Sequence, residues 1–506
     1  MTLISVFISF VFSTLGLSLL YLSQIHLKTS AFKKQSTLLE YAAENGIKRG
    51  FNNFLALLSQ RASPSILSPE QFDRLRENAR SNGPKVIEEI LGLKLPLLTS
   101  ETWEKMSWET STHCFLEQVI EEEDYFLAIH KISINSEGMI HNFSQKRKST
   151  LSASLGVLAG YLPLSLFPFL LDKKLSPEEK EDFREKNKIN FLSSKKNHIQ
   201  PQISFSEKEL IPKEANSELS KALKIKFFYP QNLSNAKLRV ILGLEESEEP
   251  IPAGVYLIKD DLGLGGIYVQ GDVEEIVMAI EKDFQVISFR NKEGIWILKY
   301  SPSKGKTFFT SPEETLSYDL IPFGIIVVNG KVKSLGGGIV DFTGEVSMIK
   351  DREVPSILQG IQLTIISSDE ITLSSHLILQ GVKWQDGVPY VKDSNSQLTI
   401  FSTGKDFWSE KITEGGITID KNSPEEIKVQ ATLTASGKGF AIEGERKKVE
   451  ILGSLQASDY LSPENSLNVT FDNRLQEENN FPKNTPRTTK PVLFISFFKL
   501  LEWREF

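Results

Sequence analysis

The stretch MTLISVFISFVFSTLGLSLLYLSQI, residues 1–25, decides how the rest of the chain is interpreted, because it contains no charged side chain. An α-helix rises about 1.5 Å per residue, and the hydrocarbon core of a bilayer is about 30 Å thick. A helix over these residues is therefore long enough to cross a membrane. We expect the stretch to be a transmembrane anchor.

The helical pattern continues beyond this apolar stretch. Residues 26–60 are more polar, but apolar side chains still recur every three or four positions. That spacing places them on one stripe of a helix. They are Leu39, Ala43, Ile47, Phe51, Phe54 and Leu58. The sequence therefore predicts that one helix leaves the membrane and continues to about residue 60.

Small residues follow one face of the predicted anchor. Ser5, Ser9 and Ser13 recur every fourth position, and Gly16 lies close to the same face. Small residues at this spacing let a second transmembrane helix approach closely. We expect these four residues to pack against other helices. The alternative is that isolated serines are simply tolerated in a membrane span.

Two short segments carry a resemblance to a known family. Met1-Thr2-Leu3-Ile4, followed by the apolar helix and then by LEYAAENGI at residues 39–47, is similar to the N-terminus of type IV pilins, in particular of minor pilins of the PilX type. The resemblance covers roughly the first 60 residues. It implies a structural minor pilin or pseudopilin subunit of a type IV pilus or a related filament. The implied partners are other pilin subunits through the N-terminal helix, the inner membrane and prepilin peptidase.

The resemblance has two departures. Ser5 stands where major pilins usually carry a glutamate, so the chain resembles minor, tip or priming subunits more than filament-building ones. The basic leader of the family would lie upstream of Met1. Without a leader, Lys28, Lys33 and Lys34 are the basic residues that flank the span, and they favour a cytoplasmic C-terminal part. With a leader, the expected location is a single pass in the inner membrane with the C-terminal part periplasmic or extracellular, and incorporation into a surface filament.

Composition limits the remaining possibilities. The chain has 506 residues, a formal net charge of -7 and 40% hydrophobic residues. That length allows two or three regions with their own cores, and the acidity argues against a nucleic-acid partner. The expected divisions are a pilin-like helix at 1–60, a small α+β pilin-like head at 61–190, a linker with short helices at 191–253 and a β-rich domain at 254–506.

The head region combines helix and strand signals. Ser68-Pro69-Glu70-Gln71 has the cap, proline and acidic first turn of a helix start, and strands are expected from His113 to Ile120 and from Tyr125 to Ile134. Residues 151–171 are uncharged and could form a second span. Pro163 and Pro168 argue against an unbroken helix there, so strands or a buried connector are expected.

The last region is rich in short β segments that end at glycines. IYVQGDV at 267–273, IVVNGKV at 326–332 and VEILGSL at 449–455 share one plan, and LTIISS at 363–368 recurs as LTIFST at 398–403. Such recurrence is typical of stacked coils. The predicted fold class is thus α+β, with an irregular right-handed parallel β-helix at residues 254–506; the alternative for this part is a β-sandwich. The part also resembles a poorly characterised domain found behind pilin-like N-termini in bacterial surface proteins.

No catalytic, cofactor or metal site is predicted. Cys114 is the single cysteine, and the six histidines lack the spacing of metal ligands. Gly263-Leu264-Gly265-Gly266 precedes a strand and not a helix, so it is no dinucleotide fingerprint. Turn aspartates such as Asp341, Asp351, Asp369 and Asp386 usually bond to the backbone. We expect a structural protein and not an enzyme; the alternative is a membrane-tethered envelope protein that binds glycans through its β-helix.

Overall fold

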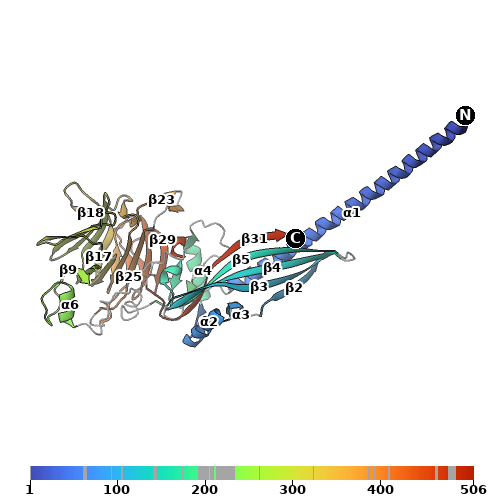
Figure 1. Cartoon of the computed structure of the whole chain (residues 1–506). Coiled ribbons are helices and arrows are strands. Elements are labelled where there is room, and N and C mark those ends of the chain that lie inside the picture. The colour runs from blue at the N-terminus through green and yellow to red at the C-terminus, as the bar shows by residue number, and fades with distance from the viewer. Residues whose placement is uncertain are drawn as a thin grey trace.

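A computed structural model shows a long helix, a sheet packed against its second half, and a larger β-rich body at the far end (Figure 1). It describes most of the chain, and everything below refers to the described residues. These are 2–60, 65–81, 83–92, 94–103, 106–122, 124–140, 145–173, 175–191, 204–205, 210–211, 234–260, 263–322, 324–385, 388–391, 395–407, 411–461, 465–476 and 486–505.

The first sheet has six strands, and all its pairings are antiparallel. In spatial order they are β1 (Ser65–Ile66), β31 (Val492–Glu505), β5 (Lys146–Gly160), β4 (Tyr125–Ile140), β3 (Met106–Glu121) and β2 (Leu97–Trp103). The last strand of the chain thus lies in the sheet of the first region, against β5. Helices α1 (Thr2–Gln60), α2 (Pro69–Ser81) and α3 (Gly83–Leu91) cover one face of it.

The predicted apolar stripe of α1 lies in the core of this first region. Leu39, Ala43, Ile47, Phe54 and Leu58 are buried, and Phe51 is partly buried against the same cluster. From α2, Phe72, Leu75 and Ala79 join the core. The period of the sequence therefore predicted correctly which face of the second half of α1 is covered.

The chain crosses to the second region at residues 161–171 and returns at residues 486–492. The two crossings run antiparallel: Pro163 bridges Arg487, and the Leu162 carbonyl accepts a hydrogen bond from Thr488 N at 2.9 Å. Residues 151–171 form the end of β5, a 3₁₀ turn (Leu164–Leu166) and β6 (Phe169–Leu171), and nearly all of them are buried. The expectation of strands or a buried connector is confirmed. The first region and the body are therefore joined by two paired segments.

The body contains two large sheets. The strands of the 11-stranded sheet are β7 (Lys188–Phe191), β30 (Ser466–Phe471), β29 (Lys448–Ala457), β27 (Glu426–Ala435), β25 (Gln397–Ser402), β20 (Gln362–Ser367), β16 (Ile325–Asn329), β10 (Gly263–Gln270) and β9 (Gly254–Asp260), with β6 and β8 (Ser204–Phe205) beside them. The strands of the 10-stranded sheet are β15 (Thr315–Tyr318), β14 (Lys306–Thr310), β13 (Gly294–Ser301), β12 (Phe284–Asn291), β11 (Glu275–Glu281), β17 (Val332–Val340), β21 (Ile371–Leu373), β26 (Ile417–Ile419) and β28 (Phe440–Ile442), with β18 (Val346–Met348) beside β17.

The chain alternates between these two sheets. Strands β16, β20, β25 and β27 belong to the first, and β17, β21, β26 and β28, which follow them in turn, belong to the second. Both sheets contribute to one shared core, for example through Ile365 and Ile400 from one and Leu373 and Ile419 from the other. The two recurring sequence segments lie side by side, because β20 pairs parallel with β25 and Leu363 is opposite Leu398. Apolar side chains at equivalent positions therefore stack from strand to strand.

Smaller elements complete the body. They are helices α4 (Pro177–Lys186) and α6 (Asn235–Ile241), the pair β19 (Pro355–Ile357) and β22 (Ile378–Leu379), the pair β23 (Val382–Gln385) and β24 (Val388–Val391), and a 3₁₀ turn (Asn473–Gln476). Ser176 and Glu179 form a capping box at the start of α4. Helix α6 packs on the outer face of the 11-stranded sheet through Leu238 and Leu242.

The predicted fold class is wrong. The chain is not α+β but mostly β, with 49% of residues in strands and 22% in helices, spread over several sheets. The described strands do not show the expected irregular right-handed parallel β-helix, because both large sheets are mixed: β9 pairs antiparallel with β10, and β11 to β15 form an antiparallel run. The recurring segments predicted parallel neighbours, but the tight turns between β11 and β15 reverse the chain direction.

Strand pairing also crosses the expected division of the chain. β31 belongs by sequence to 254–506 but lies in the sheet of the first region, while β6, within 61–190, and β7, at the end of that range, join the sheet of the body. Most of the expected linker 191–253 lies outside the described residues. Pairing partners hundreds of residues apart leave no local signal in a sequence.

Candidate functional site: the exposed half of helix α1

Two glycines let the second half of α1 lie very close to the first sheet. A side chain at Gly138 of β4 would come within 2.5 Å of Ala43 N and 2.8 Å of the Leu39 carbonyl oxygen, and one at Gly46 would overlap Ser136 of β4. Gly50 also faces β4, with more room: an added Cβ would lie 3.2 Å from the nearest methyl group. These close approaches fix where α1 sits on the sheet and hence the direction of its first half.

Polar contacts flank this seated half. Glu40 forms an ion pair with Arg147 of β5 at 3.6 Å, and Arg49 pairs with Glu101 of β2 while lying 5.5 Å from the centre of the Trp108 ring. All the charged groups are at least partly exposed, so each pair contributes little to stability. Their role is to hold α1 in position, because they connect it to β5 on one side and to β2 on the other.

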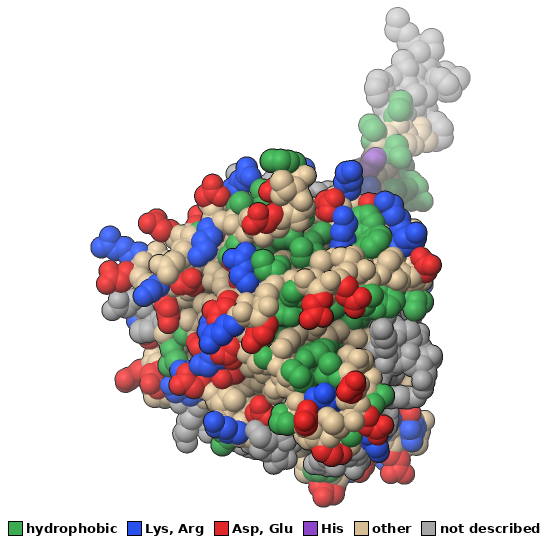
Figure 2. Space-filling model, turned by 90° about the vertical axis from the view of Figure 1, so that its left-hand side faces the viewer, with side chains coloured by type: hydrophobic (Ala, Val, Ile, Leu, Met, Phe, Trp, Pro, Cys, Tyr) green, Lys and Arg blue, Asp and Glu red, His purple; other side chains and the backbone are tan. Residues whose placement is uncertain are grey.

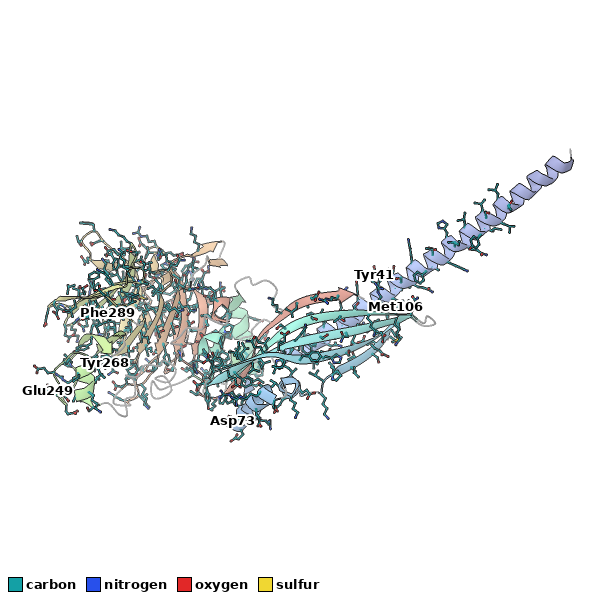
Figure 3. The ribbon with its side chains drawn as sticks, in the orientation of Figure 1. Tyr41, Asp73, Met106, Glu249, Tyr268 and Phe289 are labelled. Carbon is teal, nitrogen blue, oxygen red and sulfur yellow. The ribbon has the colours of Figure 1, made fainter. Side chains whose placement is uncertain are left out.

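The first half of α1 projects away from the sheet and exposes large apolar side chains (Figures 1 and 3). Nine such side chains between residues 15 and 32 have 42% to 68% of their surface exposed. They are Leu15, Leu17, Leu19, Leu20, Tyr21, Leu22, Ile25, Leu27 and Phe32. Isolated helices are marginal in water, and helices in proteins are usually stabilised by packing of an apolar face. We name residues 14–34 the projecting segment; it is the candidate functional site.

The projecting segment becomes basic where it approaches the sheet. Lys28, Lys33 and Lys34 are all exposed. Within the described part of the chain, no ion pair of these three side chains is found. The segment therefore offers an apolar surface followed by three positive charges.

The predicted helix-packing residues lie on the same helix. Ser5, Ser9, Ser13 and Gly16 belong to α1, but their side chains are outside the part of the structure that is described. Their packing role stays a prediction.

No described helix is both long enough and apolar enough to cross a membrane. Among the described side chains of α1, the uncharged stretch runs from Thr14 to Leu27, which is shorter than the about 20 residues that a transmembrane helix needs. The predicted transmembrane span and the single-pass inner-membrane location are therefore wrong.

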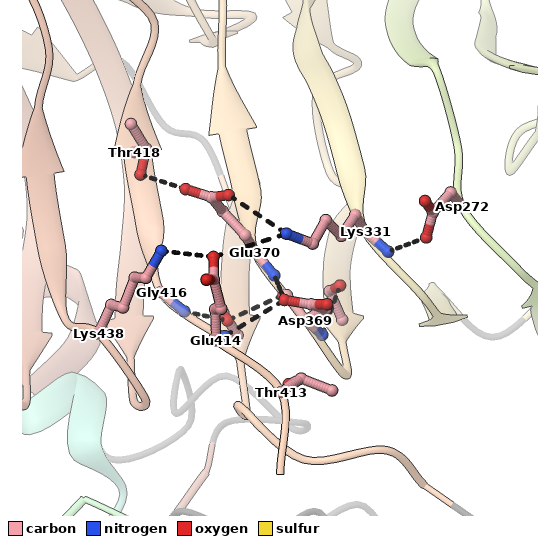
Figure 4. Close-up of polar contacts among 12 residues, drawn as sticks. Asp272, Lys331, Asp369, Glu370, Thr413, Glu414, Gly416, Thr418 and Lys438 are labelled. Carbon is pink, nitrogen blue, oxygen red and sulfur yellow. Dashed lines mark hydrogen bonds and ion pairs between the residues drawn. The ribbon is translucent and has the colours of Figure 1, made fainter. Parts of the chain in front are cut away.

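A second group of polar residues lies where the chain passes between the two large sheets (Figure 4). Lys331 lies 3.7 Å from Glu414 and 4.0 Å from Glu370, and Glu414 also pairs with Lys438. Thr418 donates a hydrogen bond to Glu370 at 2.8 Å. We name these five residues the corner ladder, because they connect successive turns of the chain.

The electrostatics of the corner ladder indicate a structural role. The hydrogen bond from Lys438 is the largest cause that lowers the pKa of Glu414, and the same contact raises the pKa of Lys438. Both groups are therefore held in their charged forms at neutral pH. Because lysines already occupy the space between the carboxylates, the ladder is a set of ion pairs and does not resemble an open site for a cation.

Two of the turn aspartates and Cys114 have structural roles. Asp341 accepts hydrogen bonds from Thr343 N and Glu345 N at 2.8 and 2.9 Å, and Asp369 accepts one from Glu370 N at 2.8 Å, so these two are turn aspartates as expected. Cys114 is buried in the first core, and burial raises the pKa of its thiol to about 12. Asp386 lies outside the described residues. Among the described residues, no cluster of acidic, histidine and cysteine side chains could hold a metal ion.

Comparison with known proteins does not assign the chain to a family. No family model matches the chain, and no curated protein matches it. One solved structure that overlaps it is that of the competence-associated pilin ComZ from Thermus thermophilus, at 9% sequence identity and a TM-score of 0.19, covering 78% of this chain and 87% of that one. At this TM-score the overlap does not establish a shared fold, and it does not confirm the PilX type.

The sequence reasoning missed one feature of the site. It did not identify Gly46 and Gly138 as contact points, although a glycine inside a helical stripe and another inside a strand both signal close backbone approach.

Proposed function

We propose that the chain is a minor or tip subunit of a pilus-related filament, and that the projecting segment of α1 packs among the helices of other subunits. The single observation that carries the proposal is the row of nine exposed apolar side chains on the part of α1 that projects from the first sheet. The N-terminal resemblance to minor pilins agrees with it. The other subunits are the proposed partners, and processing by prepilin peptidase stays a prediction of that resemblance.

The energetics are consistent with packing of this helix. Full burial of a leucine stabilises by about 1.5–3 kcal/mol, so covering nine half-exposed apolar side chains contributes on the order of 10 kcal/mol. Association itself costs about 4–15 kcal/mol of lost freedom. The two magnitudes are similar, so stable packing needs most of the segment. Loss of two leucines should weaken it measurably.

The β-rich body supports a minor or tip position. It lies at the end of the molecule opposite the projecting segment (Figure 1), and its bulk would be hard to repeat along a thin filament. On its far face, acidic and basic side chains are interspersed (Figure 2). That distribution is what we expect of a solvated surface, and together with the acidic net charge it supports a role without a nucleic-acid partner. We propose a structural and not a catalytic role.

The test is self-association of the full chain in detergent-free buffer. Sedimentation velocity over rising concentration should show oligomers, and the double variant Leu17→Gln, Leu20→Gln should stay smaller at the same concentrations. The control is Leu98→Gln, which removes a leucine that is 72% exposed on β2. A wild-type chain that stays monomeric, or equal effects of the two sets of changes, would contradict the proposal.

A further inference from the structure

Helix α2 carries an acidic outer face. Glu70, Asp73 and Glu77 are exposed and lie on the side away from the buried Phe72, Leu75 and Ala79. Figure 3 shows Asp73 on the outer side of the helix. Positions three and four apart share one helix face. The three carboxylates therefore form one negative stripe, which we name the α2 stripe.

The arginines of α2 do not neutralise this stripe. Arg74 pairs with Glu89 of α3, Arg80 pairs with Glu121 of β3 at 2.5 Å, and Arg76 donates to the Glu122 carbonyl oxygen at 2.7 Å. Each arginine thus has an acceptor on another element. Within the described residues, no lysine or arginine forms an ion pair with the carboxylates of the α2 stripe.

The projecting segment carries the complementary charge. Lys28, Lys33 and Lys34 also lie close together on an exposed helix, and they too lack an ion pair within the described residues. Resting on the proposed function, we infer that this basic part of α1 docks on the α2 stripe of a second copy of the chain. These lysines are spaced five and one residues apart and so point about 100° to 140° away from one another around the helix. Two of the three at most can therefore reach the α2 stripe of one neighbour at the same time.

The structure prevents the same contact within one chain. From Lys33 to Gly46 the helix rises about 20 Å. Gly46 packs on Ser136, and from there β4 runs about 33 Å to Phe126, whose ring lies 6.1 Å from that of Phe72 in α2. The lysines and the α2 stripe are thus about 50 Å apart along the molecule. A neighbouring copy shifted along the long axis by about this distance would bring them together.

Such a contact has a consequence for assembly. One surface of each copy meets a different surface of the next, so the contact is heterologous, and a heterologous contact that does not close into a ring forms an open helical assembly. The apolar part of the projecting segment would supply the affinity, and the charged contact would fix the axial shift between neighbours. The two parts of the segment therefore have separable roles.

The test uses charge reversal in the full chain. We expect the triple variant Lys28→Glu, Lys33→Glu, Lys34→Glu to weaken self-association about tenfold, because each exposed ion pair contributes a factor of about two to five. The triple variant of the α2 stripe, Glu70→Lys, Asp73→Lys, Glu77→Lys, should weaken it similarly. Mixing the two reversed variants should restore association. The matched control is Lys292→Glu, Lys383→Glu, Lys421→Glu, which reverses three exposed lysines of the body.

Cross-linking identifies the contact directly. A carbodiimide reagent applied to a mixture of unlabelled and ¹⁵N-labelled chains should join Lys33 or Lys34 of one copy to Asp73 or Glu77 of another, and added salt should reduce the yield. If the reversals leave association unchanged while Leu17→Gln, Leu20→Gln abolishes it, the charged contact is refuted and the proposed function stands. If the lysine variant instead loses binding to vesicles of anionic phospholipid and the α2 variant has no effect, the partner is a lipid surface and the inference is wrong. A chain that never associates refutes both.

Discussion

Replacing Gly138 by alanine should lift α1 from the first sheet. The added Cβ would lie 2.5 Å from Ala43 N and 2.8 Å from the Leu39 carbonyl oxygen, where ordinary contacts begin at 3.4 Å. Both are backbone atoms, so the helix as a whole must move. A radial gap of about 0.5–1 Å loses a quarter to a half of a dispersion contact, and it would open under Leu39, Ala42 and Ala43, which are buried.

The expected net effect is a loss of stability of about 1–2 kcal/mol. Overpacking costs about 1–3 kcal/mol, and a glycine-to-alanine change offsets about 0.4–1 kcal/mol of this by restricting the unfolded chain. Urea denaturation followed by tryptophan fluorescence should show a lower midpoint, with Trp108, which borders Gly46, as the nearest reporter.

The matched control is Gly50→Ala on the facing helix. There the nearest atom is the Ile134 methyl group at 3.2 Å, which can shift, and alanine favours a helix over glycine by about 1 kcal/mol. This variant should be neutral or slightly more stable. If Gly138→Ala unfolds at the same urea concentration as the wild type, or if the two variants lose stability equally, the close seating of α1 on β4 is wrong.

Three further predictions concern stability. Ser402 is buried and accepts a hydrogen bond from Gly416 N at 2.6 Å, so Ser402→Ala should lower the free energy of unfolding by about 1–3 kcal/mol. Neutralising one exposed carboxylate of the corner ladder should lower it by under about 1 kcal/mol. Equal urea midpoints of the two variants would contradict this prediction. His376 is buried, its Nδ1 accepts a hydrogen bond from Lys428 N at 3.1 Å, and burial is the main cause that lowers its pKa. The stability that neutral His376 contributes should be present above the unfolded pKa of about 6.5, and it should be lost as the pH falls through the lowered folded pKa. Denaturation of His376→Gln should therefore depend less on pH than that of the wild type. Deleting Val492–Glu505 should expose the edge of β5 and remove hydrogen-exchange protection from the first sheet only. An equal loss of protection over the whole chain would show that the two regions do not unfold separately.

The sequence predicted those features that depend on local period or on repetition. The stripe from Leu39 to Leu58 is buried because a helical period marks the covered face. Leu363 and Leu398 became neighbours because the segments around them repeat and so fit the same position in successive turns. The charge-free but proline-containing residues 151–171 were correctly expected to be a buried connector.

The errors arose where the structure depends on strand pairing between distant parts of the chain or on the balance of several sequence signals. Nothing in Val492–Glu505 indicates that it returns to β5, because the partner strand lies more than 300 residues earlier and pairing leaves no local mark. The fold class was wrong because the long helix and the repeats received more weight than the many short strands. The membrane prediction was wrong because no described helix is both long enough and apolar enough to cross a bilayer.

The central claim is that the projecting segment of α1 is a contact between subunits. Cysteine cross-linking with a short bismaleimide tests it most directly, since the native Cys114 is buried and its thiol pKa is raised to about 12. The account predicts that Leu20→Cys, 65% exposed on the segment, yields covalent dimers and larger species, while Phe342→Cys, fully exposed on the β17–β18 turn, yields few. Equal or greater yield from Phe342→Cys would contradict the claim.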